Sequence, residues 1–132
     1  MADAMDVHGN VFKNGAAVLL ARVVGDDGSA VVQADISSAA YSVYLLDDAQ
    51  PDQRTAVSGH TDIALVVADV IFDAMQTDSI WTVDVTGFNF RLLLDVSANQ
   101  AFATAARRYL VEVRLSPASG QVIVVRFRCN AI

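Results

Sequence analysis

The side chains best suited to chemistry in this chain stand together in Ser58-Gly59-His60-Thr61-Asp62. Serine, histidine and aspartate are the residue types of a hydrolase triad, in which the histidine takes a proton from the nucleophile. A triad depends on proximity in space, however, and the sequence lacks the Gly-x-Ser-x-Gly turn that presents a nucleophilic serine. A polar loop accounts equally well for these residues, so we interpret them as a loop and predict no enzymatic activity.

Little in the sequence indicates a metal site or a reactive thiol. Asp26-Asp27-Gly28 and Asp47-Asp48 carry oxygens that suit calcium, but the spacing of an EF-hand loop is missing, and such residues are typical of turns. The single cysteine, Cys129, cannot form an internal disulfide and continues an apolar alternation. We therefore predict a buried, hydrophobic Cys129, no metal site and no cofactor.

The charge balance is acidic, with a formal net charge of −6 from 9 basic and 15 acidic residues. The clusters Arg107-Arg108 and Arg126/Arg128 are too small to form the basic surface that binds phosphate backbones, so no nucleic-acid partner is predicted. Glu112, the single glutamate, projects from the polar face of a predicted strand between Arg108 and Arg114. We expect it to pair with neighbouring charges.

Hydrophobic residues make up 54% of the 132 residues, yet no apolar run approaches the roughly 18 residues of a membrane helix. The longest runs, Ala16–Ala21 and Ile63–Ala68, have the length of strands. The first residues, Met1–Asp6, are acidic and lack the basic start of a secretory signal. We therefore expect no membrane partner and a cytoplasmic location.

The elements that would position these residues are strands. Tyr109–Leu115 alternates apolar and charged residues with a period of two, and Gln121–Cys129 does the same. The Pro- and Gly-containing turn Ser116–Gly120 joins the two runs, which predicts an antiparallel hairpin. This pattern places the chain in the β class.

Similar runs recur along the rest of the chain. Further strands are predicted at Ala16–Val24, Ala30–Gln33, Ser38–Leu46, Asp62–Val67, Val70–Phe72, Ile80–Val85 and Phe88–Asp95. A loop is expected over Asp47–Gly59, a helical turn at Asp73–Gln76 and a short helix at Ala98–Ala106. Seven to nine short strands with at most one short helix predict an all-β antiparallel sandwich, with residues 1–15 as a flexible lead-in and 16–132 as a single domain.

Several strands are apolar on both faces, although a two-sheet sandwich needs only one apolar face per strand. Surplus apolar surface that stays exposed commonly marks a protein contact. We therefore predict a protein partner, with self-association into a homo-oligomer as the leading case; the alternative is that the chain's own loops cover this surface. The predicted interaction surface consists of Val18, Leu20, Tyr44, Leu46, Val122 and Val124.

The aromatic residues leave a second function open. Trp81 and Phe90 are expected to fill the core between two sheets, as large aromatic residues usually do. Tyr44 falls on the face opposite Tyr41 and Val43, so it is the better candidate for an exposed contact. Binding of a carbohydrate or another small molecule by exposed aromatic residues is therefore the alternative function.

Three segments carry a resemblance to a known class of domain. They are Asn14-Gly15 before the first strand, the stretch from Trp81 to Phe90, and the strand Arg108–Leu115 with Tyr109 near its start, where immunoglobulin-like folds carry a conserved tyrosine. In this ordering the chain resembles the immunoglobulin-like β-sandwich domains of bacteriophage tail and baseplate accessory proteins and of prophage-type proteins, although the paired cysteines of antibody domains are absent. The resemblance implies a non-enzymatic structural or interaction module of a virion or tail.

Overall fold

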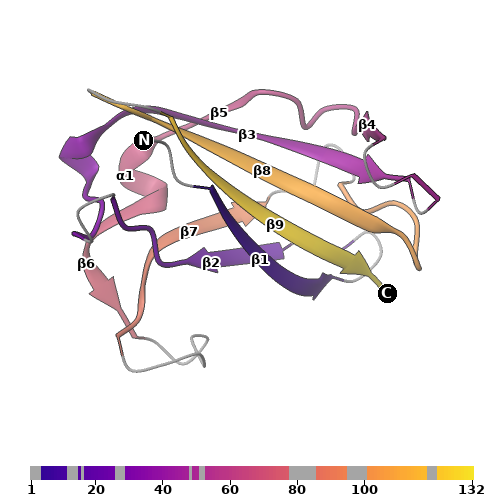
Figure 1. The fold of residues 1–132 in the computed structure, drawn as a ribbon, viewed down its shortest axis with the longest axis horizontal. Helices are drawn as coiled ribbons and strands as arrows, with labels where there is room; N and C mark the ends of the chain where they lie inside the picture. Colours follow the sequence, from indigo (N-terminus) through magenta and orange to yellow (C-terminus); the bar gives the residue numbers. More distant parts are fainter. Residues whose placement is uncertain are drawn as a thin grey trace.

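The computed structural model describes residues 4–11, 15, 17–25, 29–47, 49–50, 53–77, 86–94, 101–118 and 122–132. Within these ranges the chain forms two β-sheets that pack face to face (Figure 1). One short α-helix and one 3-10 turn complete the regular structure of the described residues. The predicted all-β sandwich is confirmed.

The larger sheet, as far as the structure describes it, contains six strands. Its order is β1 (Ala4–Val11), β9 (Ile123–Ala131), β8 (Arg108–Pro117), β3 (Ile36–Leu46) and β4 (Arg54–Ala56), and β5 (Ile63–Leu65) pairs with the same edge of β3 as β4. The predicted hairpin forms as β8 and β9, with Tyr109 opposite Cys129 and Val113 opposite Val125. We name this layer the large sheet.

The second layer, the small sheet, contains three antiparallel strands among the described residues. Their order is β2 (Ala17–Ala21), β7 (Phe88–Leu94) and β6 (Ile71–Gln76). Between β5 and β6 the helix α1 (Val67–Val70) carries the chain from one sheet to the other, and it contacts β3, β6 and β7. The 3-10 turn η1 (Gln33–Asp35) leads into β3.

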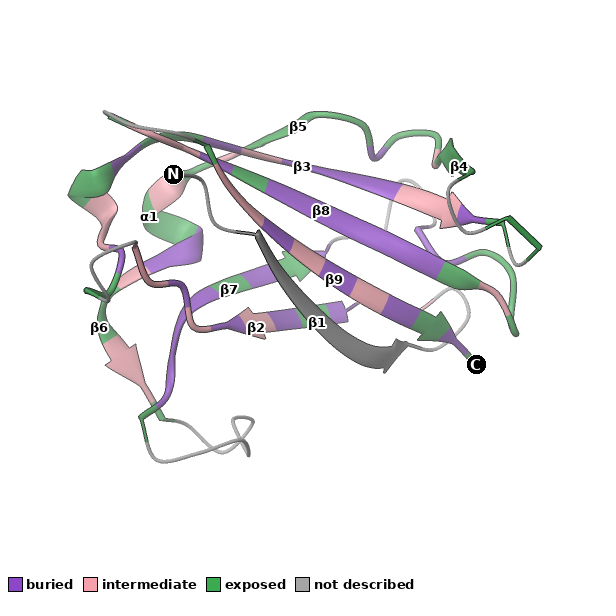
Figure 2. Ribbon diagram, in the orientation of Figure 1, coloured by how far each residue is buried: buried purple, intermediate pink, exposed green. Residues whose placement is uncertain are grey.

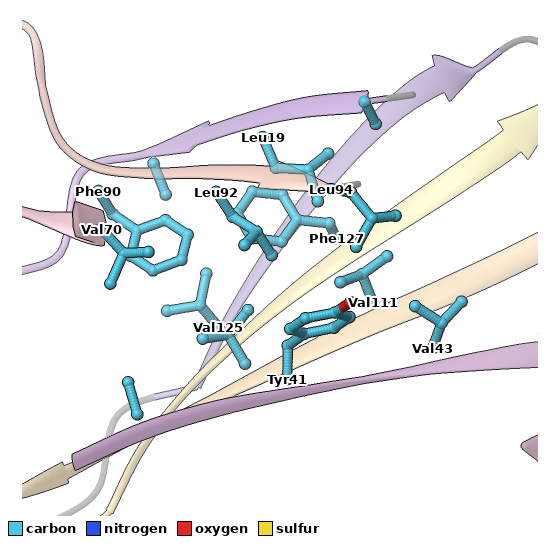
Figure 3. Packing of buried hydrophobic residues seen from close by; sticks show 14 of the residues in the cluster. Leu19, Tyr41, Val43, Val70, Phe90, Leu92, Leu94, Val111, Val125 and Phe127 are labelled. Carbon is cyan, nitrogen blue, oxygen red and sulfur yellow. The ribbon is translucent and has the colours of Figure 1, made fainter. Parts of the chain in front are cut away.

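The core lies between the inner faces of the two sheets. Phe90 from the small sheet stacks on Phe127 from the large sheet, with ring centroids 5.9 Å apart and an interplanar angle of 23°. Figure 3 shows Leu92 and Leu94 of β7 pointing toward the same layer as Val111 and Val125. Buried and exposed positions alternate along most of β2 and β7, as half-buried strands require (Figure 2). The predicted core positions of Phe90 and Cys129 are confirmed.

Two local predictions were wrong. Ala30 forms only an isolated bridge with Val24, and the 3-10 turn follows where the end of a strand was expected. Asp73–Gln76 belongs to strand β6, and the helical turn lies at Val67–Val70 instead. The β-branched content of that segment favours strand, but the chain must leave the large sheet there and enter the small sheet, so tertiary context overrides propensity.

The assignments of one loop and one short helix also differ. The predicted loop Asp47–Gly59 contains the short strand β4, because the free edge of β3 offers backbone partners to Arg54–Ala56. The part of Ala98–Ala106 that the structure describes, residues 101–106, holds bends and turns rather than a helix. The predicted strand Ile80–Val85 lies outside the described residues.

The first residues form a strand where a flexible lead-in was expected. Residues 4–11 of the stretch 1–15 make up β1, which pairs in parallel with β9 from Ala4 opposite Val124 to Val11 opposite Ala131. This pairing supplies backbone partners to the edge of β9 that β8 leaves free. The N-terminal and C-terminal strands therefore lie side by side (Figure 1).

A buried asparagine ties the connection after β2 to the small sheet. The Asn89 side chain, which is 1% exposed, accepts a hydrogen bond from the Val23 backbone N–H at 2.7 Å. Its amide nitrogen donates to the backbone oxygens of Val23 and Val31, both at 2.9 Å. One side chain thus satisfies three backbone groups in a segment that has almost no strand pairing of its own.

Asn89→Ala is expected to lower the free energy of unfolding by roughly 2–4 kcal/mol, because it leaves buried backbone groups without partners. Urea denaturation of the wild type and the variant measures this change. Asn130→Ala, at an exposed position on β9, is the matched control and should change stability by less than about 0.5 kcal/mol. Equal effects of the two substitutions would show that the Asn89 bonds do not stabilise the fold.

Candidate functional site

The six residues of the predicted interaction surface lie on two different faces. Val18 and Leu20 lie on the outer face of the small sheet, opposite the inward Ala17 and Leu19. Tyr44 and Leu46 lie at outward positions of β3, and Val122 and Val124 lie just before and within β9, also facing outward on the large sheet. Val18 and Val122 are exposed, Leu20, Tyr44 and Val124 are half-buried, and Leu46 is buried. The structure therefore does not join them into one surface.

The outer face of the small sheet carries an exposed apolar group that includes two residues missed in the sequence. Val18 and Leu93 are cross-strand partners, and they are 48% and 66% exposed. Val66, just before α1, is 63% exposed. We name Val18, Leu20, Val66 and Leu93 the Leu93 surface. Leu93 continues the alternate positions of Asn89 and Arg91 along β7, so extending the period of two from Phe88–Arg91 through the three leucines would have identified it as the outward residue.

A hollow of about 710 Å³ adjoins this surface. It lies where β5 and α1 approach β7, and its lining is Val18, Ala64, Leu65, Val66, Asp69, Val70, Arg91, Leu92 and Leu93. Along Arg91–Leu94, one edge of β7 pairs with β2. No strand of the described residues pairs with the other edge there. A strand edge with unpaired backbone groups next to an apolar hollow is a favourable place for another strand to add.

The outer face of the large sheet is charged instead. Glu112 on β8 is buried, with its side chain 7% exposed, and three arginines from three strands surround it. Arg54 Nη1 lies 3.5 Å from Glu112 Oε2, Arg114 Nε lies 3.4 Å from Oε1, and Arg126 Nε lies 3.4 Å from Oε2. We name Arg54, Arg114 and Arg126 the arginine cluster. Pairing with Arg114 follows the prediction, Arg126 lies directly opposite Glu112 in the β8–β9 hairpin, and Arg54 comes from β4, which is distant in the sequence.

Tyr44 lies on the same outer face, beside the arginine cluster. The guanidinium carbon of Arg54 lies 4.1 Å from the centroid of its ring, which is a cation–π distance. One face of the Tyr44 ring is therefore occupied by the protein itself. Trp81, the other aromatic residue considered for ligand stacking, lies outside the described residues.

The side chains of His60 and Asp62 each bond to a residue of β3. His60 is buried, and its Nδ1 lies 2.9 Å from the Tyr41 hydroxyl in a hydrogen bond. Asp62 turns to Ser42 instead: its backbone N–H donates to Ser42 Oγ at 2.9 Å, and Ser42 Oγ donates to Asp62 Oδ1 at 3.4 Å. Ser58 is exposed in the turn before His60. These bonds hold the segment that follows β4 against β3.

Cys129 is buried on the inner face of β9, and burial raises the pKa of its thiol from 9.0 to about 11.

No group of three or more metal-ligating side chains occurs among the described residues. Within the same residues, none of the helices is long and apolar enough to cross a membrane. Asp26, Asp27 and Asp48, considered above as calcium ligands, lie outside the described residues.

Comparison with known protein families, with curated proteins and with solved structures found no match to this chain. The two surfaces of the described residues, one apolar and one rich in arginine, are therefore the basis for the proposals below.

Glu112→Gln is expected to lower the free energy of unfolding by about 1–2 kcal/mol, because three neighbouring guanidinium groups would lose the carboxylate between them. Solvent relieves part of the repulsion, since all three arginines are partly exposed. Chemical denaturation at low and high salt measures the loss, which should be smaller at high salt. Asp69→Asn, at an exposed carboxylate, is the control and should be neutral. A neutral Glu112→Gln would contradict this stabilising role.

Alkaline pH is expected to destabilise the protein through Cys129. Unfolding returns the thiol pKa from about 11 to 9.0, so between these values the unfolded chain has lost a proton that the folded chain keeps. The stabilising contribution is fully present below pH 9.0 and is lost as the pH rises toward about 11, by at most roughly 2–3 kcal/mol. Unfolding of the wild type and of Cys129→Ala across this range measures the difference. Parallel loss of stability in both proteins would contradict the assignment to Cys129.

Proposed function

We propose that this protein is a non-enzymatic interaction module that associates with copies of itself through the Leu93 surface. The observation that carries the proposal is the exposed cross-strand pair of Val18 and Leu93, at 48% and 66%, beside an apolar hollow. Exposed apolar groups of this kind favour association because water is released from them on contact.

The edge of β7 supports a particular geometry of association. Along Arg91–Leu94 its second edge has no ladder partner in the part of the chain that the structure describes. In a two-fold dimer the same edge of each copy can pair antiparallel with the other, which continues the small sheet across the interface. Such pairing places Leu93 and Val18 of both copies on one continuous face, while backbone hydrogen bonds fix the register.

The wider role is a structural one. The resemblance of the sequence to immunoglobulin-like domains of bacteriophage tail and baseplate accessory proteins supports a virion or tail component. The confirmed sandwich is compatible with that class, since its strands leave outer faces available for contact. Carbohydrate binding is the weaker alternative, because Arg54 covers one face of Tyr44.

Leu93→Asp is expected to abolish self-association, because it places a charge at the centre of the apolar contact. Size-exclusion chromatography with light scattering at micromolar concentration should give at least twice the 14.1 kDa chain mass for the wild type and the single-chain mass for the variant. Circular dichroism of both proteins checks that the variant folds.

Ile132→Asp is the matched control, since Ile132 is also an exposed apolar residue, at 58%, but lies at the end of the chain after β9. It should retain the mass of the wild type. A wild type that remains a single chain at high micromolar concentration, or equal effects of both substitutions, would overturn the proposal.

A further inference from the structure

The outer face of the large sheet holds a charged group that the proposed self-association does not use. Glu112 lies between its cross-strand partners Ser42 and Arg126. Two residues further along β8, on the same outer face, Arg114 lies opposite Val124. Arg54 reaches the same point from β4 at the edge of the sheet. The arginine cluster thus converges from three strands on one carboxylate.

The charges of this group do not balance. Three guanidinium groups surround a single carboxylate, so the group has a surplus of two positive charges in a chain of net charge −6. Each guanidinium has five N–H donors, whereas one carboxylate has about four acceptor sites. Most donors of the arginine cluster are therefore available to a further acceptor. Neutralising Glu112 alone would need only one arginine.

Burial separates the carboxylate from the cations. The Glu112 side chain is 7% exposed, while the side chains of Arg54, Arg114 and Arg126 are 41%, 58% and 33% exposed. The carboxylate therefore lies beneath the guanidinium groups and holds them close together at the surface. Cations that are already held in place lose less conformational freedom when they bind a ligand.

The same side chains line a hollow of about 380 Å³, together with Val122 and Val124. We propose that this hollow binds an oxyanion, a phosphate or carboxylate group, whose neighbouring apolar atoms contact the two valines. Phosphate and carboxylate are the groups whose oxygens match the planar fork of arginine. The valines favour a ligand that carries an apolar portion beside its charged group.

The test uses the full chain and two probes, inorganic phosphate and butyrate. Amide proton–nitrogen correlation spectra are recorded during titration with each probe, against sodium chloride at equal ionic strength. Phosphate, butyrate or both should shift amides of β4, β8 and β9 around the hollow, beyond the shifts that chloride causes. A response to one probe alone supports the proposal and identifies which oxyanion is preferred.

Arg114 is the most exposed arginine of the cluster. Arg114→Gln should weaken oxyanion binding by about tenfold, because it removes one charge-assisted contact to the ligand. Arg91→Gln, on the outer face of the small sheet, is the control and should bind as the wild type does. The proposal is overturned if neither probe exceeds chloride, if the shifts are scattered over the chain, or if Arg114→Gln and Arg91→Gln weaken binding equally. Leu93→Asp should leave this binding unchanged, which separates its outcome from that of the proposed self-association.

Discussion

The structure depends on the packing of a wide sheet against a narrow one through a single layer of apolar side chains. Phe90 on β7 stacks on Phe127 on β9, and the inward residues of the neighbouring strands fill the layer around them. Since the small sheet, as described, has half as many strands as the large sheet, the two layers cannot cover each other completely. The helix α1 contacts both sheets, and Asn89 holds the irregular segment that follows β2.

The two sheets have outer faces of different chemistry. On the outer face of the small sheet Leu93 and Val18 face water near Arg91, and the edge of β7 at Leu93 lacks a strand partner in the described residues. On the large sheet Glu112 organises arginines from three strands, beside the outward Val122 and Val124. Because the faces lie on opposite sides of the core, a protein contact at one and an anion at the other need not compete.

The local elements that the sequence predicted correctly are those with clear periodicity. The hairpin of β8 and β9 follows from alternation and turn chemistry, and β3 and β7 begin and end within a few residues of their predicted bounds. Predictions failed where the chain changes sheet, as at Val67–Val70, or where an edge recruits a short partner, as at β1 and β4. In those places the structure depends on which backbone groups a distant strand leaves free, and a local pattern has no information about them.

The candidate surfaces show the same division. The sequence by itself determined the class of fold, the excess of apolar strand faces and the burial of Phe90 and Cys129, because hydrophobic period and residue size act within a single strand. Only the tertiary structure decided that Val66 stays exposed beside the hollow, that Arg54 covers one face of Tyr44, and that Arg54 joins Arg114 and Arg126 at Glu112. Those contacts arise from strand order and register. Both depend on pairing between segments that are separated in the sequence, so a pattern within one strand does not contain them.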